Sequence, residues 1–194
     1  MTLSASDISA ARADLAKIPV KAPASFAGYA RDRFGAAWTD HCSTAGCDNR
    51  CDTRNDILAR DLVNDIIDAK GCIIRSGTLY DPYTGTTILF TRGAGTSSAV
   101  QIDHIVSLGD AWRTGAQDIS VELRTNLAND PANLVAVDGP TNGAKSDSDA
   151  SEWLPPTPSA RCPYVVHQVE VKITYRLWMT PAEHDAVETV LDDC

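Results

Sequence analysis

The chain has 194 residues, 43% of them hydrophobic, and a formal net charge of −9. This length suits one compact domain, and no apolar run approaches the roughly 20 residues that a membrane-spanning helix needs. The acidic balance excludes a protein that holds nucleic acid by bulk positive charge alone, although a bound divalent cation can supply positive charge locally. We therefore expect a single domain over residues 1–194 with no membrane partner.

Residues 1–50 are interpreted as an N-terminal helix followed by a cysteine-rich extension. Apolar residues recur at helical spacing over residues 5–17, and a Pro- and Ala-rich stretch ends this pattern. Met1 to Ser4 has neither the basic start nor the apolar stretch of a signal peptide. If the protein is exported, we expect this chain to be its mature form with an added Met.

The six cysteines indicate disulfide bonds. Their grouping, four in the first half and two in the second, suggests the pairs Cys42–Cys47, Cys51–Cys72 and Cys162–Cys194. The alternative is a zinc site that adds His41 to the first three cysteines, but the spacing is not that of paired CxxC knuckles. Disulfides are favoured, and they predict an oxidising compartment and hence a secreted protein.

A helix and a strand pair are predicted next along the chain. Thr53 has the character of a helix N-cap, and the apolar pattern continues to a stop at Lys70 and Gly71. Two strands at 77–80 and 86–91 flank a turn that contains Pro and Gly.

The second half alternates short strands and helices. Residues 99–106 and 133–137 read as strands, and a helical insertion broken at Gly115 separates them. A short helix over 141–149 follows. Residues 163–178 fit both a helix and a strand, and their length favours the helix.

The final helix is clearer than the segment before it. Thr180 and Glu183 form a capping-box pattern, with a proline in the first turn.

Asp103, His104 and Asn142 are the residues with the clearest chemical potential. Phosphodiester hydrolysis needs a base to deprotonate water and a cation to stabilise the phosphate and its leaving oxygen. A histidine has the unperturbed pKa that suits the base, and hard divalent ions take carboxylate and amide oxygens. One obstacle is that neighbouring residues on a regular strand point to opposite faces, so the strand must bend or end near His104.

Three short stretches carry a resemblance to a known family: DHIV at 103–106, NLVAV at 133–137 and NGAKSD at 142–147. This series resembles the ββα-metal, or His-Me finger, motif of HNH nucleases, including the HNH domain of RNA-guided CRISPR nucleases. More widely, the chain is similar to secreted actinobacterial HNH endonucleases, which relate to the C-terminal nuclease domain of GmrSD-type restriction enzymes. The resemblance covers roughly residues 51–194.

The resemblance implies a role for each matching residue. His104 would activate water, Asp103 and Asn142 would bind the metal, and Asn133 would orient the loop that holds His104. Ser107 departs from the commonest pattern, which has Pro there, and Asn142 stands where the HNH label has its second His. The second departure favours Mg²⁺, with Mn²⁺ or Ca²⁺ as alternatives, over zinc.

Lys145 and Arg124 are the candidates for contacts to substrate phosphate. A solvated helix position is the alternative for Lys145, and a surface ion pair is the alternative for Arg124.

Together these observations predict an α+β fold in which a ββα-metal unit at 99–150 is surrounded by helices and stapled by disulfides. The expected activity is metal-dependent hydrolysis of DNA, with RNA as the alternative substrate, and with little sequence specificity, because no recognition module is evident. No obligate protein partner is expected. A catalytically inactive binding module of the same fold and another metal-dependent phosphohydrolase are the alternatives.

Overall fold

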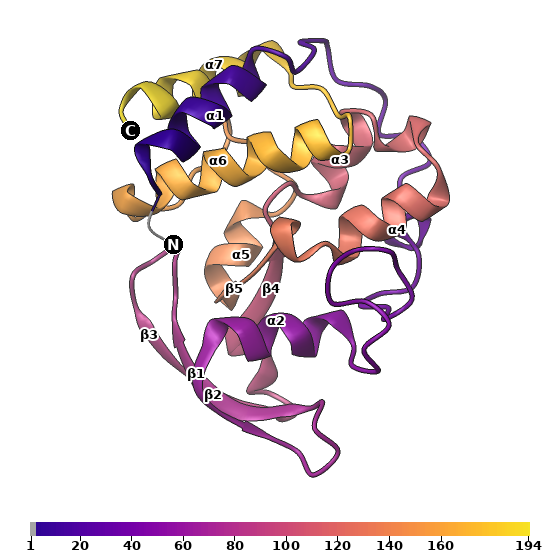
Figure 1. Ribbon diagram of the computed structural model, residues 1–194, viewed down its shortest axis with the longest axis vertical. Helices are drawn as coiled ribbons and strands as arrows, with labels where there is room; N and C mark the ends of the chain where they lie inside the picture. Colours follow the sequence, from indigo (N-terminus) through magenta and orange to yellow (C-terminus); the bar gives the residue numbers. More distant parts are fainter. Residues whose placement is uncertain (1–2) are drawn as a thin grey trace.

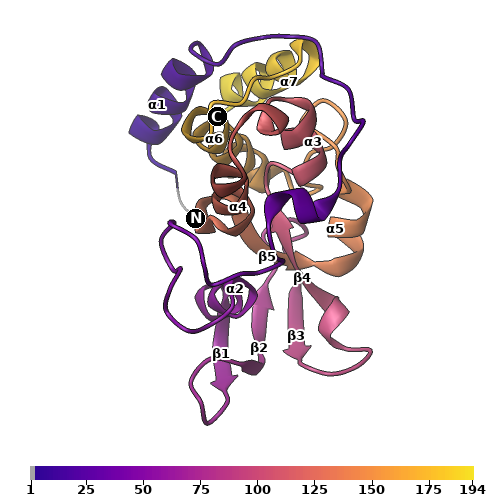
Figure 2. The same cartoon turned by 90° about the vertical axis from the view of Figure 1, so that its right-hand side faces the viewer.

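The computed structural model describes residues 3–194, so Met1, on which the expectation of an added residue rests, lies outside the described residues. The fold is mixed α+β with two small antiparallel sheets (Figure 1). A three-stranded sheet lies at one end of the molecule and a layer of helices at the other, with a strand pair between them (Figures 1 and 2). Within residues 3–194, no helix is long and apolar enough to cross a bilayer.

The helical layer consists of α1 (Ala5–Leu15), α6 (Pro158–Thr174) and α7 (Pro181–Asp192), which pack around one apolar core. Capping boxes begin the two terminal helices: Ser4 pairs with Asp7, and Thr180 pairs with Glu183. The helices expected at 5–17, at 163–178 and after Thr180 are therefore confirmed.

The helix expected from Thr53 to Lys70 is wrong in its second half. Helix α2 (Thr53–Asp61) begins at an Asp52 N-cap and is followed at once by strand β1 (Leu62–Ile67). The spacing of the apolar residues in β1 fits a helix as well as a strand. The β1 backbone pairs with the next strand, from Leu62 opposite Leu79 to Ile67 opposite Ile74. Tertiary pairing thus overrides the local helical pattern.

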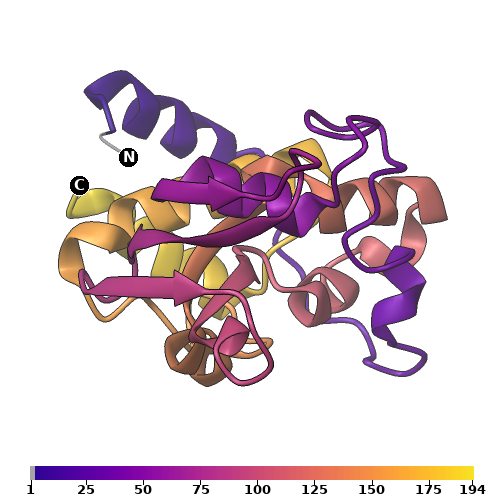
Figure 3. The same cartoon turned by 90° about the horizontal axis from the view of Figure 1, so that it is seen from below.

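The expected strand–turn–strand is confirmed as β2 (Ile74–Tyr80) and β3 (Thr87–Thr91). Figure 3 shows β1, β2 and β3 side by side, seen from the end of the molecule that they form. One face of this sheet packs on α2 through a core that includes Leu58 and Phe90.

The central strand pair positions the candidate site. Strand β4 (Val100–His104) pairs antiparallel with β5 (Leu134–Asp138), and the ladder runs regularly from Val100 opposite Asp138 to His104 opposite Leu134. Helix α5 (Gly139–Lys145) follows β5 directly.

The expected helical insertion between these strands is present as α3 (Leu108–Arg113) and α4 (Val121–Asn129). It is interrupted at Gly115, whose φ of 127° is open to glycine and rare for other residues.

Three disulfides join the pairs that the sequence suggests: Cys42–Cys47, Cys51–Cys72 and Cys162–Cys194, with Cα–Cα distances of 5.4, 5.2 and 5.9 Å. The alternative zinc site at His41 is therefore wrong, because its three cysteines are already consumed by two of these bonds.

The Cys162–Cys194 bond is expected to contribute most to stability, since it closes a loop with a sequence separation of 32, against 5 for Cys42–Cys47. Replacing both cysteines of the long loop with serine should lower the free energy of unfolding by about 2–5 kcal/mol. The same change at Cys42 and Cys47 is the control and should cost less. Urea denaturation measures both, and an equal loss in the two variants would contradict this loop-length explanation.

Candidate functional site

Asn133 fixes the loop that leaves β4. Its buried amide accepts a hydrogen bond from the Val106 N–H at 2.8 Å and donates to the carbonyl oxygens of Val106 and Leu127 at 3.3 and 3.2 Å. The Asn133 carbonyl also accepts from the Ile105 N–H at 2.8 Å. The side chain of Asn133 therefore ties the loop after β4 to the end of α4.

His104 lies at the end of β4, and among the described residues only one of its two ring nitrogens has a hydrogen-bond partner. Its Nε2 is 3.0 Å from the carbonyl oxygen of Ala128, and its ring stacks on Trp38 with 5.6 Å between centroids. The pKa of His104 is lowered to about 3, mainly by burial; the Ala128 carbonyl opposes this effect, and nearby Arg31 and Lys145 add to it. The ring is thus neutral near pH 7, and because a carbonyl can only accept, Nε2 carries the proton and Nδ1 carries the lone pair.

The Asp103 side chain projects from the face of β4 opposite to that of His104, and it is buried beside two hydrogen-bond donors. The Tyr83 hydroxyl donates to Oδ2 at 2.6 Å, and the Lys145 ammonium lies 2.9 Å from Oδ1. The same ammonium donates to the His104 carbonyl oxygen at 2.7 Å. An ionised carboxylate has about four lone-pair positions, so the two contacts leave acceptor capacity for a further ligand.

Asn142 is carried by α5 and faces the same side of β4 as Asp103. Its Nδ2 donates to the Gln101 Oε1 at 2.9 Å, which leaves the Asn142 Oδ1 as an acceptor. Carboxylate and amide oxygens are the ligands that a hard divalent cation prefers, and Mg²⁺ takes only one or two of them from protein. The donor set of Asp103 and Asn142 therefore fits such an ion.

These residues border one pocket of about 490 Å³. Asp103, His104 and Asn142 line it together with Arg31 and Arg54. Strand β4 is regular up to His104 and ends there, so of the two expected possibilities, a bend or an end, the structure has the end. Asp103 and His104, although neighbours on the strand, both line this pocket.

Lys145 and Arg124 do not occupy the phosphate-contacting positions expected from the sequence. Lys145 is fully buried, with its ammonium on Asp103 and the His104 backbone. Arg124 donates instead to three carbonyl oxygens, those of Arg33, Ala116 and Ile119. Both side chains therefore bind other parts of the protein: the Lys145 ammonium neutralises the buried Asp103 carboxylate, and the Arg124 guanidinium binds backbone carbonyls that hold a loop.

Arg31 and Trp38 border the pocket although sequence reasoning gave them no role. Arg31 is exposed on the 3₁₀ turn η1 (Arg31–Phe34), and within residues 3–194 its guanidinium has no hydrogen bond or ion pair. Figure 2 shows this violet turn beside the end of β4. The segment has no helical or strand periodicity, so its arginines and Trp38 were the only available signals.

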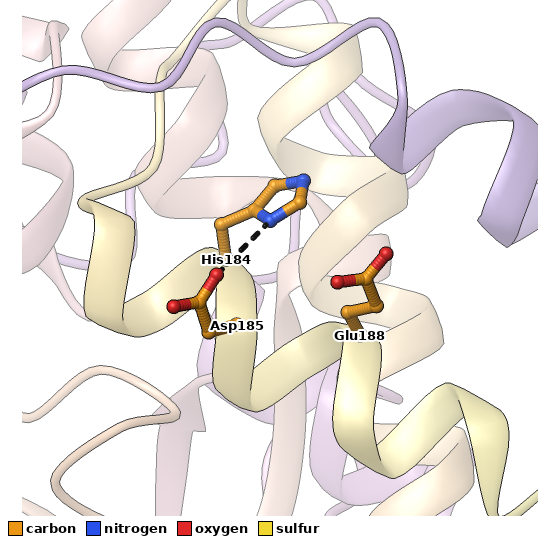
Figure 4. A group of neighbouring side chains, drawn as sticks. All are labelled: His184, Asp185 and Glu188. Carbon is orange, nitrogen blue, oxygen red and sulfur yellow. Dashed lines mark ion pairs between the residues drawn. The ribbon is translucent and has the colours of Figure 1, made fainter.

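A group of candidate metal ligands lies elsewhere, on α7. His184, Asp185 and Glu188 bring ligand atoms within 4.8 Å of one another (Figure 4). The two carboxylates are exposed, and the His184 Nδ1 lies 3.8 Å from the Asp185 Oδ1. None of the three side chains is buried, and within residues 3–194 such exposed acidic groups are what a solvated helix face ordinarily carries.

A buried charge cluster joins α3, α6 and α7. The Lys172 ammonium lies 2.6 Å from the Glu183 Oε1 and 2.9 Å from the Asp110 Oδ2, with Asp149 close by. The Lys172 ammonium thus contacts two carboxyl groups, those of Glu183 and Asp110. Burial raises the pKa of Glu183 to about 8, with Lys172 opposing the rise and Asp110 adding to it.

This cluster predicts a pH-dependent stability. Between pH 4.5, the usual pKa of a glutamate, and about pH 8, folded Glu183 holds a proton that the unfolded chain has released. The free energy of unfolding should therefore fall as the pH rises through this window. Glu183→Gln, which keeps a side chain able to cap the helix, should flatten the profile, whereas exposed Glu188→Gln should not. Urea denaturation between pH 5 and 8 measures this, and identical slopes for wild type and Glu183→Gln would contradict it.

Comparisons with known proteins place these residues in a broader context. Residues 52–187 match the family described as GmrSD restriction endonucleases, C-terminal domain. The chain is 37% identical over 169 residues to an uncharacterized secreted protein of the fungus Arthroderma benhamiae, covering 86% of this chain and 76% of that protein. No solved structure matches the chain. Arg31 and Trp38 precede the matched region, whereas Asp103, His104, Asn133 and Asn142 lie within it.

Proposed function

The chain belongs to the family of GmrSD restriction endonuclease C-terminal domains, and from this premise we propose that it is a metal-dependent HNH-type endonuclease. Its family is nuclease-related, and β4, β5 and α5 would form the ββα-metal catalytic unit within a single domain over residues 1–194. The observation that carries the proposal is the convergence of Asp103, His104 and Asn142 on one pocket.

His104 is the general base of this proposal. The hydrogen bond from Nε2 to the Ala128 carbonyl fixes the tautomer in which Nδ1 accepts a proton. Nδ1 would take that proton from a water molecule, and the hydroxide that results would attack phosphorus. An anionic phosphate next to the ring favours its protonated form and so raises the low pKa of His104 during the reaction.

The other residues position this chemistry. Asn133 holds the loop after β4, and Lys145 keeps the Asp103 carboxylate in place through a buried ion pair. Asp103 and Asn142 would hold Mg²⁺, with Mn²⁺ or Ca²⁺ as alternatives. Such a cation, when bound, supplies positive charge that stabilises the phosphate oxygens and the departing 3′ oxygen. Arg31, free of protein partners within residues 3–194, would contact a phosphate of the substrate.

The substrate would be DNA, with RNA as the alternative, cut with little sequence specificity. Three disulfides are consistent with an extracellular location, and the fungal relative is named as a secreted protein. We infer that this protein also acts outside the cell.

Plasmid nicking tests the proposal. Supercoiled DNA should be converted to open-circular DNA in Mg²⁺, and EDTA should stop the conversion. If no cleavage of DNA or RNA occurs in Mg²⁺, Mn²⁺ or Ca²⁺, the protein is an inactive binding module. Hydrolysis of p-nitrophenyl phosphate without cleavage of nucleic acid would instead identify a different phosphohydrolase. Either result would overturn the proposed endonuclease.

A further inference from the structure

A smaller pocket of about 240 Å³ opens beside His104. Residues 31–38 form one wall, and the opposite wall comprises His104, Leu108, Ala128 and Asn129. Arg31, Trp38, His104 and Leu108 border this pocket and also the larger one. A group seated in the small pocket would therefore lie next to whatever His104 acts on.

The size and lining of this pocket suit one flat, mostly apolar group. Drug-sized ligands occupy pockets of about 300–1,000 Å³, so this pocket takes something smaller, on the scale of a nucleobase. Asn129 adds a polar group: its Nδ2 donates to the Thr125 carbonyl at 2.9 Å, while its buried Oδ1 has no hydrogen-bond partner among the described residues.

The wall formed by residues 31–38 is held firmly in place. Phe34 is 1% exposed in the apolar core, and the Arg124 guanidinium donates to the Arg33 carbonyl at 2.8 Å. At the other end of the wall, the Thr53 N–H donates to the Trp38 carbonyl at 3.2 Å. The pocket is thus built before any ligand arrives, by a segment that lies outside the residues matched to the family.

We propose that this pocket receives one unpaired nucleobase adjacent to the phosphate that His104 addresses, which makes single-stranded nucleic acid the preferred substrate. This inference rests on the proposed function. A base in a duplex is stacked and paired, so it enters such a pocket only after extrusion, at a cost that a single strand does not bear. Apolar walls bind any base through its faces, which agrees with low sequence specificity.

The first arm of the test compares strands. The same labelled oligonucleotide, alone and annealed to its complement, is cleaved in Mg²⁺, and the single strand should react at least about tenfold faster, the scale of one lost base contact. A single abasic residue placed in turn at each position of the single strand should lower cleavage at the neighbouring phosphate by a similar factor.

The second arm fills the pocket. Ala37 is exposed and lines the pocket, so Ala37→Leu should remove the preference for single strands without unfolding the protein. Ala27→Leu, at an exposed position outside both pockets, is the matched control. The abasic substrate should lower the cleavage rate of wild type and of Ala27→Leu about tenfold. It should not lower the cleavage rate of Ala37→Leu further, because the pocket of that variant is already blocked.

A binding measurement in EDTA separates this inference from the proposed function. The fluorescence of 2-aminopurine in a single strand should change on binding to wild type and to Ala27→Leu, but not to Ala37→Leu. If this change is seen in EDTA while no cleavage occurs in Mg²⁺, Mn²⁺ or Ca²⁺, the endonuclease is overturned and the base pocket remains supported. Equal cleavage of single and double strands, with no coupling between Ala37→Leu and the abasic site, overturns the base pocket alone.

Discussion

His104→Ala is expected to lower the rate of Mg²⁺-dependent plasmid nicking by about 10²–10⁴-fold, the usual contribution of a general base. The reason is local: the ring has Nε2 committed to the Ala128 carbonyl and Nδ1 available to a water molecule. No other histidine borders either of the two pockets at this site, among residues 3–194. A gel assay of supercoiled DNA over time measures the rate.

Two controls make the His104 result specific. His184→Ala, on α7 and remote from the pocket, should leave the rate unchanged. Added imidazole should partly restore nicking by His104→Ala, since the lost ring leaves a space beside Trp38 that borders the pocket. Near-wild-type nicking by a folded His104→Ala, as judged by circular dichroism, would remove His104 from the mechanism.

Lys145→Met is expected to lower the free energy of unfolding by about 3–5 kcal/mol, because it leaves a buried carboxylate without its counter-charge. The Lys145 side chain is 0% exposed and the Asp103 side chain 5% exposed, with 2.9 Å between the ammonium and the carboxylate. The substitution also removes the hydrogen bond to the His104 carbonyl. Guanidinium denaturation in EDTA isolates this loss from any effect of metal binding.

Two further variants test whether burial and the unpaired charge explain the effect of Lys145→Met. Lys17→Met breaks a surface ion pair with Asp14 and should cost at most about 1 kcal/mol. Adding Asp103→Asn to Lys145→Met should recover much of the lost stability, because the unpaired charge is removed. A Lys145→Met variant as stable as Lys17→Met would show that the buried pair contributes nothing to folding.

Local signals in the sequence were sufficient for much of the fold. Capping boxes at Ser4 and Thr180 are short-range patterns, and so are the β-rich runs of β3 and β5. The order of Asp103, His104, Asn133 and Asn142 also followed from the sequence, because each belongs to a short motif on its own element. Such features need no knowledge of distant residues.

Long-range contacts decided what local patterns left ambiguous. The apolar residues after Asp61 fit a helix until β2 is present to pair with them. In the sequence, Lys145 and Arg124 look like ordinary surface residues. In the structure, Lys145 binds a carboxylate 42 residues away and Arg124 binds a carbonyl oxygen 91 residues away. No pattern within either segment reports these partners.

The sequence by itself determined the cysteine pairs, the strand–helix order around Asp103 and His104, and the identity of the oxygen and imidazole groups available for chemistry. Tertiary structure alone decided that residues 31–38 form a wall of the site and that Lys145 faces inward. The physical reason is that a side chain's charge and shape are written in the sequence, whereas its neighbours, and so its exposure and its acid–base behaviour, are set only when distant segments pack together.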